Sequence, residues 1–399
     1  MQSIVLTAAL IVTPFGVLAQ EVGGPPNNVR MRIGPLFVNP TLALSNAGRD
    51  TNVFNDPTNP QEDFTVTISP ATDLWLRLGP TWAQSNIRED IVWFQKFASE
   101  RSANNSYTLK WLVPLNRLAL TTSWAYVNTR ERPGFEIDTR AEHSQQAYVV
   151  GAEYRFLSKT FIGAEAHVGV TKFDPDASFL GTNLHDQLNE TSTTLSLSVR
   201  HQLTPLTSLL VTGSDSQDRF ELNALRNSES RGLAGTIKFD PAALLKGSAT
   251  FGYKDFQPTS RDVPAYRGTT ASVDLSYVLL GVTKFGATAT RDVQYSYDVN
   301  QPYYLQTGVT GTVSQQLFGP LDIVVNGGFR RLEYRDRAGA VIVAPNRTDR
   351  QTTLGGGFGY HLGRDTRIGI NLAQAERRSP LTLHTYKGLQ YGISVTYGS

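Results

Sequence analysis

The sequence predicts an all-β protein, folded as a single transmembrane antiparallel up-and-down β-barrel. From about Phe64 to the last residue, runs of roughly a dozen residues alternate between apolar and polar side chains. Tight turns and longer polar loops alternate between these runs. A barrel in lipid produces both features, because each strand has one face toward lipid and one toward a wet interior.

The run from Thr191 to Arg200 shows the two faces most clearly. Successive side chains of a strand point to opposite sides, so odd and even positions can be read separately. The odd positions are Thr193, Leu195, Leu197 and Val199, and the even positions are Ser192, Thr194, Ser196, Ser198 and Arg200. An aliphatic face opposite a hydroxyl-rich face predicts lipid outside the wall and water inside it.

The composition excludes several other classes of protein. With 40% hydrophobic residues and a mean hydropathy of −0.25, the chain lacks the long apolar runs of a helical membrane bundle. The formal net charge is +2, without the basic stripe of a nucleic-acid groove, so no nucleic-acid partner is expected. The absence of cysteine excludes disulfides and thiolate chemistry and is typical of a chain that crosses an oxidising periplasm unfolded.

The N-terminus is typical of a secretory signal peptide. Ile4 to Leu18 is an apolar segment, and Ala19 ends a small-residue cleavage pattern, although no Lys or Arg precedes the apolar segment. A buried N-terminal helix is the alternative. We therefore expect a signal peptide at 1–19, a periplasmic lead-in at 20–33 and the barrel at 34–399.

The short turns recur with apolar alternation on both sides, and in a barrel they lie at the periplasmic rim. They are expected at Gly79-Pro80, Pro114-Leu115-Asn116, Leu157-Ser158-Lys159, Thr204-Pro205-Leu206, Asp240-Pro241, Leu280-Gly281, Phe318-Gly319-Pro320 and Gly363-Arg364-Asp365. The longer polar stretches, expected to be extracellular, are near 47–60, 97–104, 130–141, 174–188, 219–228, 257–267, 295–302, 335–348 and 377–385. Eight turns and nine loops join eighteen strands, an even number that returns both ends to the periplasm.

Two segments fit the pattern less well. Residues 62–78 keep their phase as one long strand, but Pro70 cannot donate a ladder hydrogen bond, so a β-bulge is expected there. In 81–97 the large apolar residues do not share one side, which leaves sixteen strands as an alternative. None of the loops is long enough to be obvious as an inward-folded constriction.

Many tyrosine and tryptophan residues fall near strand ends on the expected lipid face. Amphipathic aromatic rings prefer the headgroup level, and barrels carry aromatic girdles at both interfaces. The candidate interface residues are Trp124, Tyr126, Tyr148, Tyr154, Tyr253, Tyr277, Tyr360, Tyr391 and Tyr397. A soluble β-sandwich would instead need a second face rich in Leu, Ile and Phe.

The candidate lumen-facing residues include charges of both signs. They are Arg77, Glu153, Arg155, Glu165, His167, Arg200, Asp274, Asp322 and Arg330. Because their charges nearly balance, the sequence favours neither anions nor cations. Cross-strand ion pairs that stiffen the wall are a commoner role for such residues than contact with a solute.

No constellation in the sequence indicates an enzyme. His143 and Ser144 are adjacent on one expected strand, so their side chains point to opposite faces and cannot form a nucleophile and base pair. The other histidines lack metal-ligand spacing, and no phosphate-binding glycine loop is present. We therefore expect no catalytic residue, no metal site and no cofactor.

The first hairpin carries a family resemblance. The segment from Arg32 to Pro57 combines a proline-containing strand with a D-x-N-V-F loop, formed here by Asp50, Asn52, Val53 and Phe54. It resembles the opening of the putative β-barrel porin type 2 family of bacterial outer-membrane proteins. The resemblance implies an outer-membrane barrel, often associated with exopolysaccharide or capsule production, and it supplies no catalytic residues.

The sequence thus predicts a channel or porin in the outer membrane of a Gram-negative bacterium, for passive diffusion or export, with exopolysaccharide secretion as one role. The alternative is a non-conducting barrel that supports envelope or polysaccharide machinery through its loops. The expected partners are outer-membrane lipid and lipopolysaccharide, the barrel-assembly machinery, and polysaccharide-secretion components.

Overall fold

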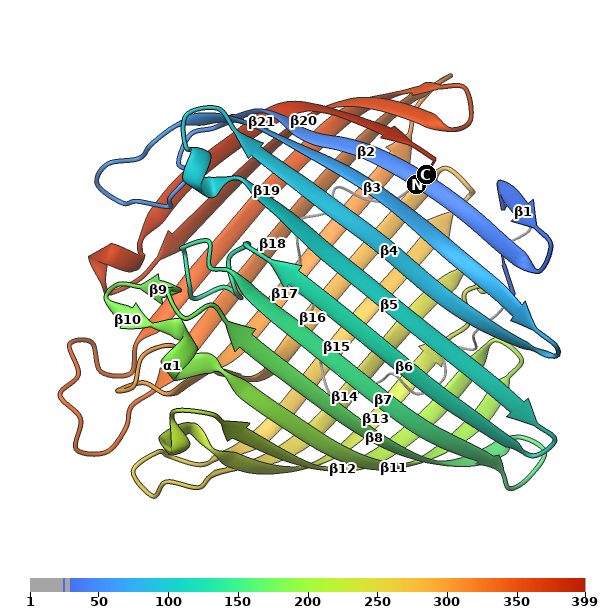
Figure 1. The fold of residues 1–399 in the computed structure, drawn as a ribbon, viewed down its shortest axis with the longest axis horizontal. Helices are drawn as coiled ribbons and strands as arrows, with labels where there is room; N and C mark the ends of the chain where they lie inside the picture. The colour runs from blue at the N-terminus through green and yellow to red at the C-terminus, as the bar shows by residue number, and fades with distance from the viewer. Residues whose placement is uncertain (1–23, 26–28, 399) are drawn as a thin grey trace.

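The computed structural model describes residues 24–25 and 29–398. The expected signal peptide at 1–19 and its cleavage site lie outside the described residues, as does much of the expected lead-in at 20–33. The described chain forms one closed wall of tilted strands around a central space (Figure 1).

Eighteen long strands of the described chain build the wall. They are β2 Leu36–Asp50, β3 Asp63–Leu78, β4 Thr81–Phe94, β5 Ser102–Leu115, β6 Leu118–Thr129, β7 His143–Arg155, β8 Thr160–Phe173, β11 Glu190–Thr204, β12 Thr207–Phe220, β13 Ser228–Phe239, β14 Leu245–Pro258, β15 Tyr266–Leu279, β16 Thr283–Tyr295, β17 Tyr303–Gln316, β18 Leu321–Arg335, β19 Thr348–Leu362, β20 Thr366–Arg378 and β21 Tyr386–Tyr397. Each strand pairs antiparallel with the next along the chain, and β2 pairs with β21 to close the ring. The predicted fold and strand number are confirmed.

The connections alternate in length as the sequence predicts. The eight short turns lie at one end of the wall, called the turn rim, and the nine longer connections lie at the other, called the loop rim. At the turn rim, β1 Met31–Ile33 pairs with the start of β2. The loop rim carries the small hairpin β9 Ser178–Phe179 with β10 Thr182–Asn183, and the helix α1 Leu184–Leu188.

Short 3-10 turns complete three other loops, at Ala98–Glu100, Ala224–Arg226 and Thr382–His384. Within the described residues, every helix is too short and too polar to cross a bilayer.

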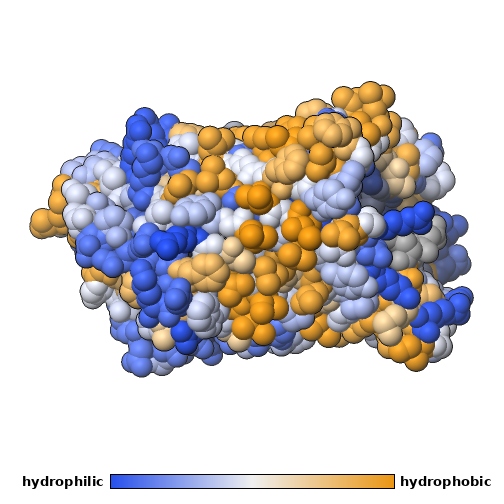
Figure 2. All heavy atoms as spheres, turned by 90° about the horizontal axis from the view of Figure 1, so that it is seen from above, coloured by the Kyte–Doolittle hydropathy of each residue, from blue (hydrophilic) through white to orange (hydrophobic). Residues whose placement is uncertain are grey.

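The outer face of the wall is apolar over its middle. Figure 2 shows a band of hydrophobic residues with hydrophilic residues gathered toward the loop rim. On β11, Leu195, Leu197 and Val199 are exposed, whereas Thr194 and Ser198 on the other face are buried. Exposed aliphatic side chains in such a band cost free energy in water and are stable against lipid acyl chains.

The expected β-bulge lies on a different strand from the one predicted. Around Pro70, the pairing of β3 with β4 lapses and resumes in the same register, from Ile68↔Ile91 to Ala71↔Arg88. The register shift falls instead on β2, where Asn46 has a positive φ of 54° and both neighbouring strands slip by one residue. Pro70 has no N–H to donate, so a local gap in the ladder suffices, while Asn is one of the few residues that adopt a left-handed conformation readily.

The mixed phase of 81–97 also has a structural reason. On β4, Ile91 and Trp93 are exposed on the outer face, opposite Ile68 and Val66 of β3. Trp82 and Phe94 point inward at the two ends of the same strand, and Phe94 is buried in the packing at the loop rim. The strand is regular throughout, so the alternative of sixteen strands is wrong.

Leu197 tests the lipid-facing assignment of the wall. It lies at the centre of β11 and is 69% exposed. Leu197→Arg should lower the free energy of unfolding in lipid vesicles by about 2–4 kcal/mol, the cost of an arginine at the bilayer midplane. The matched control is Ser196→Arg, which places the same charge on the inner face. Denaturant titration of both variants should show a small effect for Ser196→Arg, and equal losses would contradict the assignment.

Candidate functional site: the barrel interior and its loop-covered mouth

The inner wall is polar and many of its groups are paired across strands. The hydroxyls of Thr194 and Ser216 lie 2.9 Å apart, as do those of Thr236 and Thr250. Lys254 forms an ion pair of 2.6 Å with Asp292. A wall of hydroxyls and charged groups can line a wet interior, and these cross-strand pairs hold its side chains in place.

The structure brings some of the candidate lumen residues together. Glu153 of β7 and Arg200 of β11 form an ion pair of 2.5 Å across the intervening strand β8. Arg155 and Arg200 both lie over the ring of Phe161, at 5.6 and 3.9 Å. This cluster cross-links three consecutive strands, which is the stiffening role expected of charges inside a barrel.

Other candidates lie apart from that cluster. Arg77 lies near the turn rim with its guanidinium 6.0 Å from the ring of Trp82. His167 is buried on the inner wall, and neither of its ring nitrogens has a hydrogen-bond partner in the described chain. Glu165 is its neighbour on the inner face of β8, and Asp274 is exposed on β15. These residues are spread around the ring and form no single binding site.

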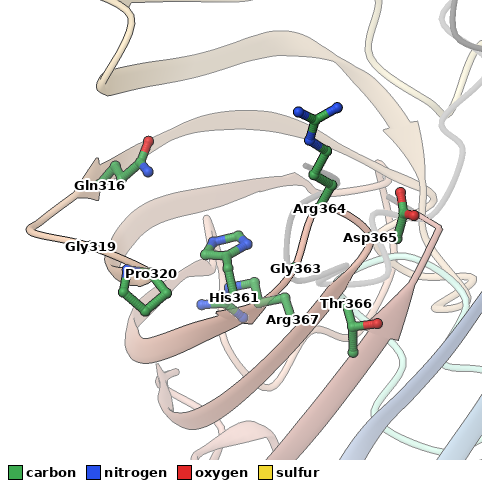
Figure 3. A pocket seen from close by; sticks show the side chains of 9 residues that line it. All are labelled: Gln316, Gly319, Pro320, His361, Gly363, Arg364, Asp365, Thr366 and Arg367. Atoms are coloured by element: carbon green, nitrogen blue, oxygen red, sulfur yellow. The ribbon is translucent and has the colours of Figure 1, made fainter.

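At the turn rim, Asp322 joins three strands. Its carboxylate accepts two hydrogen bonds from Arg367, at 2.7 and 2.6 Å, and lies 2.7 Å from Nε2 of His361. A cavity of about 530 Å³ opens beside this cluster (Figure 3), lined by Gln316, Gly319, Pro320, His361, Gly363, Arg364, Asp365, Thr366 and Arg367. Since Asp322 already contacts both Arg367 and His361, the cluster serves first to tie β18, β19 and β20 together.

The connection 130–142 runs across the mouth at the loop rim and is called the crossing loop here. It joins β6 to β7, which lie opposite β17 and β18 in the ring. In the described barrel, seven strands separate the two pairs on each side: β8 with β11 to β16 on one, and β2 to β5 with β19 to β21 on the other. Any contact between the crossing loop and β17 or β18 therefore spans the full width of the mouth.

The crossing loop makes such contacts through Phe135 and Glu136. The Phe135 ring lies 3.7 Å from the guanidinium of Arg330 on β18 and packs against Tyr304 and Tyr334. The Glu136 carboxylate accepts hydrogen bonds from the Ser296 hydroxyl at 2.7 Å and from the Tyr297 backbone N–H at 3.1 Å. The sequence shows no long segment that is obvious as an inward-folded constriction, and the structure instead places this short loop across the mouth.

The ends of β16 and β17 meet the crossing loop by leaning into the mouth. β15 and β16 are paired only from Ala271↔Arg291 toward the turn rim, so the two strands separate near the loop rim. Beyond that point, Tyr303, Tyr304, Leu305 and Gln306 are all buried, although alternate residues of a strand face opposite sides. This end of β17 keeps its pairing with β16 and β18, and its burial on both faces shows that loop residues cover its outer side as well.

Two further loops reach the same place. Phe179 of the β9–β10 hairpin packs edge-on against Tyr297, at 4.9 Å between ring centroids, and against His384 at 5.8 Å. Arg226, after β12, donates hydrogen bonds to the carbonyl oxygens of Ser296 and of Pro302, the latter at 3.0 Å. Loops from well-separated parts of the ring thus meet over the mouth.

A buried ion network holds the crossing loop to the wall. Arg377 of β20 donates to the Asp138 carboxylate at 3.0 Å, to the Glu136 carbonyl oxygen at 2.9 Å and to Asp349 at 2.5 Å. Asp349 also accepts from Arg347 at 2.5 Å. Removing one partner from a buried network leaves an uncompensated charge, so each member depends strongly on the others.

Burial shifts the pKa of two groups in the mouth in opposite directions. It raises the pKa of the Glu136 carboxyl to about 7, against the lowering effects of Arg347 and of the hydrogen bond from Ser296. It lowers the pKa of His384 to about 3, and the nearby cations Arg347 and Arg377 act in the same direction. The Tyr297 hydroxyl lies 3.1 Å from Nε2 of the neutral His384 ring.

The D-x-N-V-F residues lie where the ring closes and support the crossing loop. Asp50 accepts hydrogen bonds from the Asn52 backbone N–H at 2.9 Å and from Gln390 of β21 at 2.7 Å. Val53 is buried against Val92 and Phe94, and its carbonyl oxygen accepts from Arg132 at 2.6 Å. Phe54 packs edge-on against Phe97 at 4.8 Å. The motif thus links the closing seam to the base of the crossing loop.

The candidate interface aromatics share the outer face of the wall. Trp124 is the register partner of Tyr148 and Leu109, both exposed, and it stacks with Tyr126 at 6.2 Å. The exposed rings also include Tyr154, Tyr253, Tyr277, Tyr360, Tyr391 and Tyr397.

His143 and Ser144 serve no joint chemistry here, because His143 is buried with Nδ1 2.8 Å from the Ala141 carbonyl oxygen. Among the described residues, no cluster of His, Asp and Glu could hold a metal ion.

Sequence reasoning missed the residues that matter most at the mouth: Glu136, Asp138, Arg347, Asp349, Arg377 and His384. One signal was available, since Phe135 and Ile137 place two large apolar side chains in a loop that otherwise reads as solvent-exposed. Apolar residues in such a loop indicate that it packs against something.

A polar-walled, eighteen-stranded barrel with an apolar outer band is matched by one family model, described as "Putative beta-barrel porin 2", over residues 25–398. The chain belongs to this family. The predicted resemblance is therefore confirmed, and with it the outer-membrane location of this porin-family barrel. No curated protein sequence matches the chain.

Solved outer-membrane barrels are similar in overall architecture. The outer membrane protein OpdK from Pseudomonas aeruginosa is 9% identical with a TM-score of 0.46, over 90% of this chain and 98% of OpdK. The FrpB iron transporter from Neisseria meningitidis, F3-3 variant, is 9% identical with a TM-score of 0.43, over 86% of this chain. The porin-family chain spans 62% of the length of that FrpB structure.

Arg377→Met should loosen the crossing loop. The substitution leaves Asp138 buried without its cation, a change that costs about 3–5 kcal/mol for a buried pair. Hydrogen exchange of the amides at 134–138 should accelerate accordingly, while exchange in the middle of the strands stays unchanged. The control is Arg378→Met, one residue along, whose side chain is 79% exposed on the outer wall. Equal acceleration in both variants would show that the buried network does not hold the loop.

The two shifted groups give opposite pH dependences that offset each other in the wild type. The raised pKa of Glu136 stabilises the closed mouth fully below 4.5, and this contribution is lost as pH rises through about 7. The lowered pKa of His384 stabilises the closed mouth above 6.5, and this contribution is lost as pH falls toward about 3. Between pH 4.5 and 6.5, closing the mouth adds a proton to Glu136 and removes one from His384. The two effects cancel, so the stability of the closed mouth changes little with pH in that range.

Removing one of the two groups should therefore reveal the pH dependence of the stability of the closed mouth that the other produces. In planar bilayers, with pH varied on the loop-rim side, Glu136→Gln should open more often as pH falls below 6.5, by about 1.4 kcal/mol per pH unit. His384→Gln should open more often as pH rises from 4.5 to 7. Parallel pH profiles for the two variants would contradict the assignment of the pKa shifts.

Proposed function

We propose that this porin-family barrel is a gated channel for hydrophilic solutes across the outer membrane, and that the crossing loop is its constriction. The observation that carries the proposal is the reach of Phe135 across the full width of the mouth to Arg330, Tyr304 and Tyr334. A lumen lined by hydroxyls and paired charges supports passage of water and small polar molecules. We infer transport because the family is described as a porin family and the lining is polar.

The loops are placed outside the cell in this proposal, and the short turns in the periplasm, as is general for bacterial outer-membrane barrels. This orientation follows secretion through a signal peptide cleaved near Ala19 in a Gram-negative cell and insertion by the barrel-assembly machinery. The N-terminal domain boundaries at 19 and 33 belong to the same proposal.

The crossing loop is suited to gating because non-covalent contacts alone hold it closed. The chain has no cysteine, so no disulfide ties the loop to the wall. The loop enters and leaves through β6 and β7, whose pairing from Leu118↔Tyr154 to Thr129↔His143 does not depend on the contacts at the mouth. The loop can therefore leave the mouth while the barrel stays closed as a ring.

Export of exopolysaccharide is the narrower proposal, and it rests on the family resemblance. Passage of a sugar polymer through the mouth would require the contacts of Phe135, Glu136 and Phe179 to break together. The channel would then open only when engaged by polysaccharide-secretion components. Small solutes need a smaller opening, so basal conductance and polymer export make different demands on the same loop.

A non-conducting docking barrel is the second candidate. The observation that favours it is the exposed apolar tip of loop 336–347, where Val341 and Val343 are 91% and 88% exposed. Such side chains on a loop beyond the wall are typical of contact with another protein. Co-purification of polysaccharide-secretion proteins from membranes, together with no conductance in any variant, would favour this alternative.

Replacement of residues 134–138 by Gly-Ser-Gly-Ser-Gly tests the channel. The variant keeps the loop length but removes Phe135, Glu136 and Asp138, so single-channel conductance in planar bilayers should rise severalfold. The control replaces Val341, Ile342 and Val343 by Gly-Ser-Gly, in a loop tip whose two valines are almost fully exposed, and should conduct as the wild type does. Equal conductance of wild type and both variants would refute the crossing loop as the constriction.

A further inference from the structure

The outer wall carries a row of like charges at the loop rim of β18, β19 and β20. Arg331, Arg350 and Arg378 are direct register partners across these three strands, Arg331↔Arg350 and Arg350↔Arg378. Like charges directly opposite one another destabilise a sheet. A row of three arginines in register therefore calls for a compensating anion.

The row faces away from the lumen. Arg331 is on the same face of β18 as the exposed Phe329, Arg350 on the same face of β19 as Leu354, and Arg378 on the same face of β20 as Leu372. Arg350 is exposed, and the side chain of Arg331 is 47% exposed. The guanidinium groups can therefore meet a ligand that lies against the outside of the barrel.

The acidic residues of the described wall do not neutralise the row. Arg331 pairs with Glu333 at 2.9 Å and Arg378 with Glu376 at 2.5 Å, each on its own strand. Glu333 also contacts Arg335 at 3.6 Å. Arg350, at the centre of the row, forms no ion pair or side-chain hydrogen bond in the described chain. Its guanidinium keeps five N–H donors for an external acceptor.

A neighbouring strand adds to the positive charge. Lys387 of β21 is the register partner of Glu376 and is exposed on the outer face. Among the described residues of this patch, five basic side chains, Arg331, Arg335, Arg350, Arg378 and Lys387, face two acidic ones, Glu333 and Glu376. The patch therefore keeps an excess of three positive charges.

The patch lies at the edge of the apolar band. Phe329 is two residues and Leu354 four residues from the arginine row along their strands, toward the middle of the wall. Figure 2 views the wall that is uppermost in Figure 1, where β20 and β21 run, and shows hydrophilic residues at the loop rim beside hydrophobic ones. A ligand here would place an anionic group on the arginines and hydrocarbon on the band.

We propose that this arginine row binds the phosphate groups of lipopolysaccharide in the outer leaflet. Arginine forks match phosphate oxygens in geometry, and a charge-assisted pair is about twice as strong as a neutral hydrogen bond. The acyl chains of the same lipid would cover Phe329, Leu354 and Leu372. The inference uses the proposed orientation of the loops but does not depend on whether the barrel conducts.

The test measures binding of fluorescent lipopolysaccharide to the folded barrel in phosphatidylcholine vesicles. Arg350→Gln should weaken binding about tenfold, equivalent to about 1.4 kcal/mol, and Arg350→Lys should recover part of the loss. The matched control is Arg231→Gln, an outer-wall arginine of β13 that is 86% exposed but already paired with Asp215 at 3.1 Å. Its effect should be less than about twofold, since a surface pair contributes little. Heat-modified migration in gels confirms that each variant is folded.

Further measurements identify the chemical group that the arginine row binds and the molecule that carries it. Dephosphorylated lipopolysaccharide should bind wild type and Arg350→Gln equally weakly. Millimolar inorganic phosphate and vesicles containing phosphatidylglycerol at equal charge should not compete for the site. Full competition by inorganic phosphate would overturn the lipid assignment in favour of a free-phosphate site. Equal losses in Arg350→Gln and Arg231→Gln would overturn it in favour of general surface charge. Conductance recorded on the same variants separates a failure of this inference from a failure of the channel.

Discussion

Closure of the hydrogen-bonded ring is the constraint on which the rest of this structure depends. In lipid, an unpaired backbone N–H or carbonyl has no water to bond, so the wall must be continuous. The first and last strands, β2 and β21, complete it, and the bulge at Asn46 lets them meet in register. The fit is close: a Cβ on Gly48 would lie 1.9 Å from the Tyr391 carbonyl oxygen, so only glycine is tolerated there. The D-x-N-V-F residues lie beside this seam and connect it by hydrogen bonds to the crossing loop.

The mouth follows a different physical logic from the wall. The wall separates its apolar and polar side chains onto two faces. The mouth instead packs the rings of Phe135, Tyr304 and Tyr334 beside fully buried charged side chains, as the interior of a soluble protein does. Burial of Arg377 and Asp349 is tolerated because each has several partners. Contact with lipid requires a paired wall with apolar side chains on its outer face. That requirement ends where β15 and β16 separate, and the chain beyond that point can fold inward. The proposed gating would move only the mouth, because the wall does not depend on the contacts made there.

The sequence predicts the wall well because its signals are local. Alternation along each strand and Pro, Gly and Asp at each turn are properties of neighbouring residues, and they locate all eight turns. The position of the bulge was not predictable in the same way, since Asn46 is an ordinary polar residue until the register of β3 and β21 is known. The crossing loop was missed for a related reason. Glu136 and Arg377 are 241 positions apart, and nothing near either residue indicates the other. The arginine row likewise becomes visible only once Arg331, Arg350 and Arg378 are brought into register.

The same separation has a consequence for the order of folding. Hydrogen bonds from Arg377 to Phe135 and Glu136 join chain segments 242 and 241 residues apart, whereas the hairpins of the wall join near neighbours. Contacts of such high contact order form slowly, because the entropy of closing the intervening chain must be overcome first. We therefore expect the interior packing of the mouth to form late, once the wall has placed β18 and β20 opposite the crossing loop. The packing of the mouth is therefore expected to follow closure of the ring rather than to guide it.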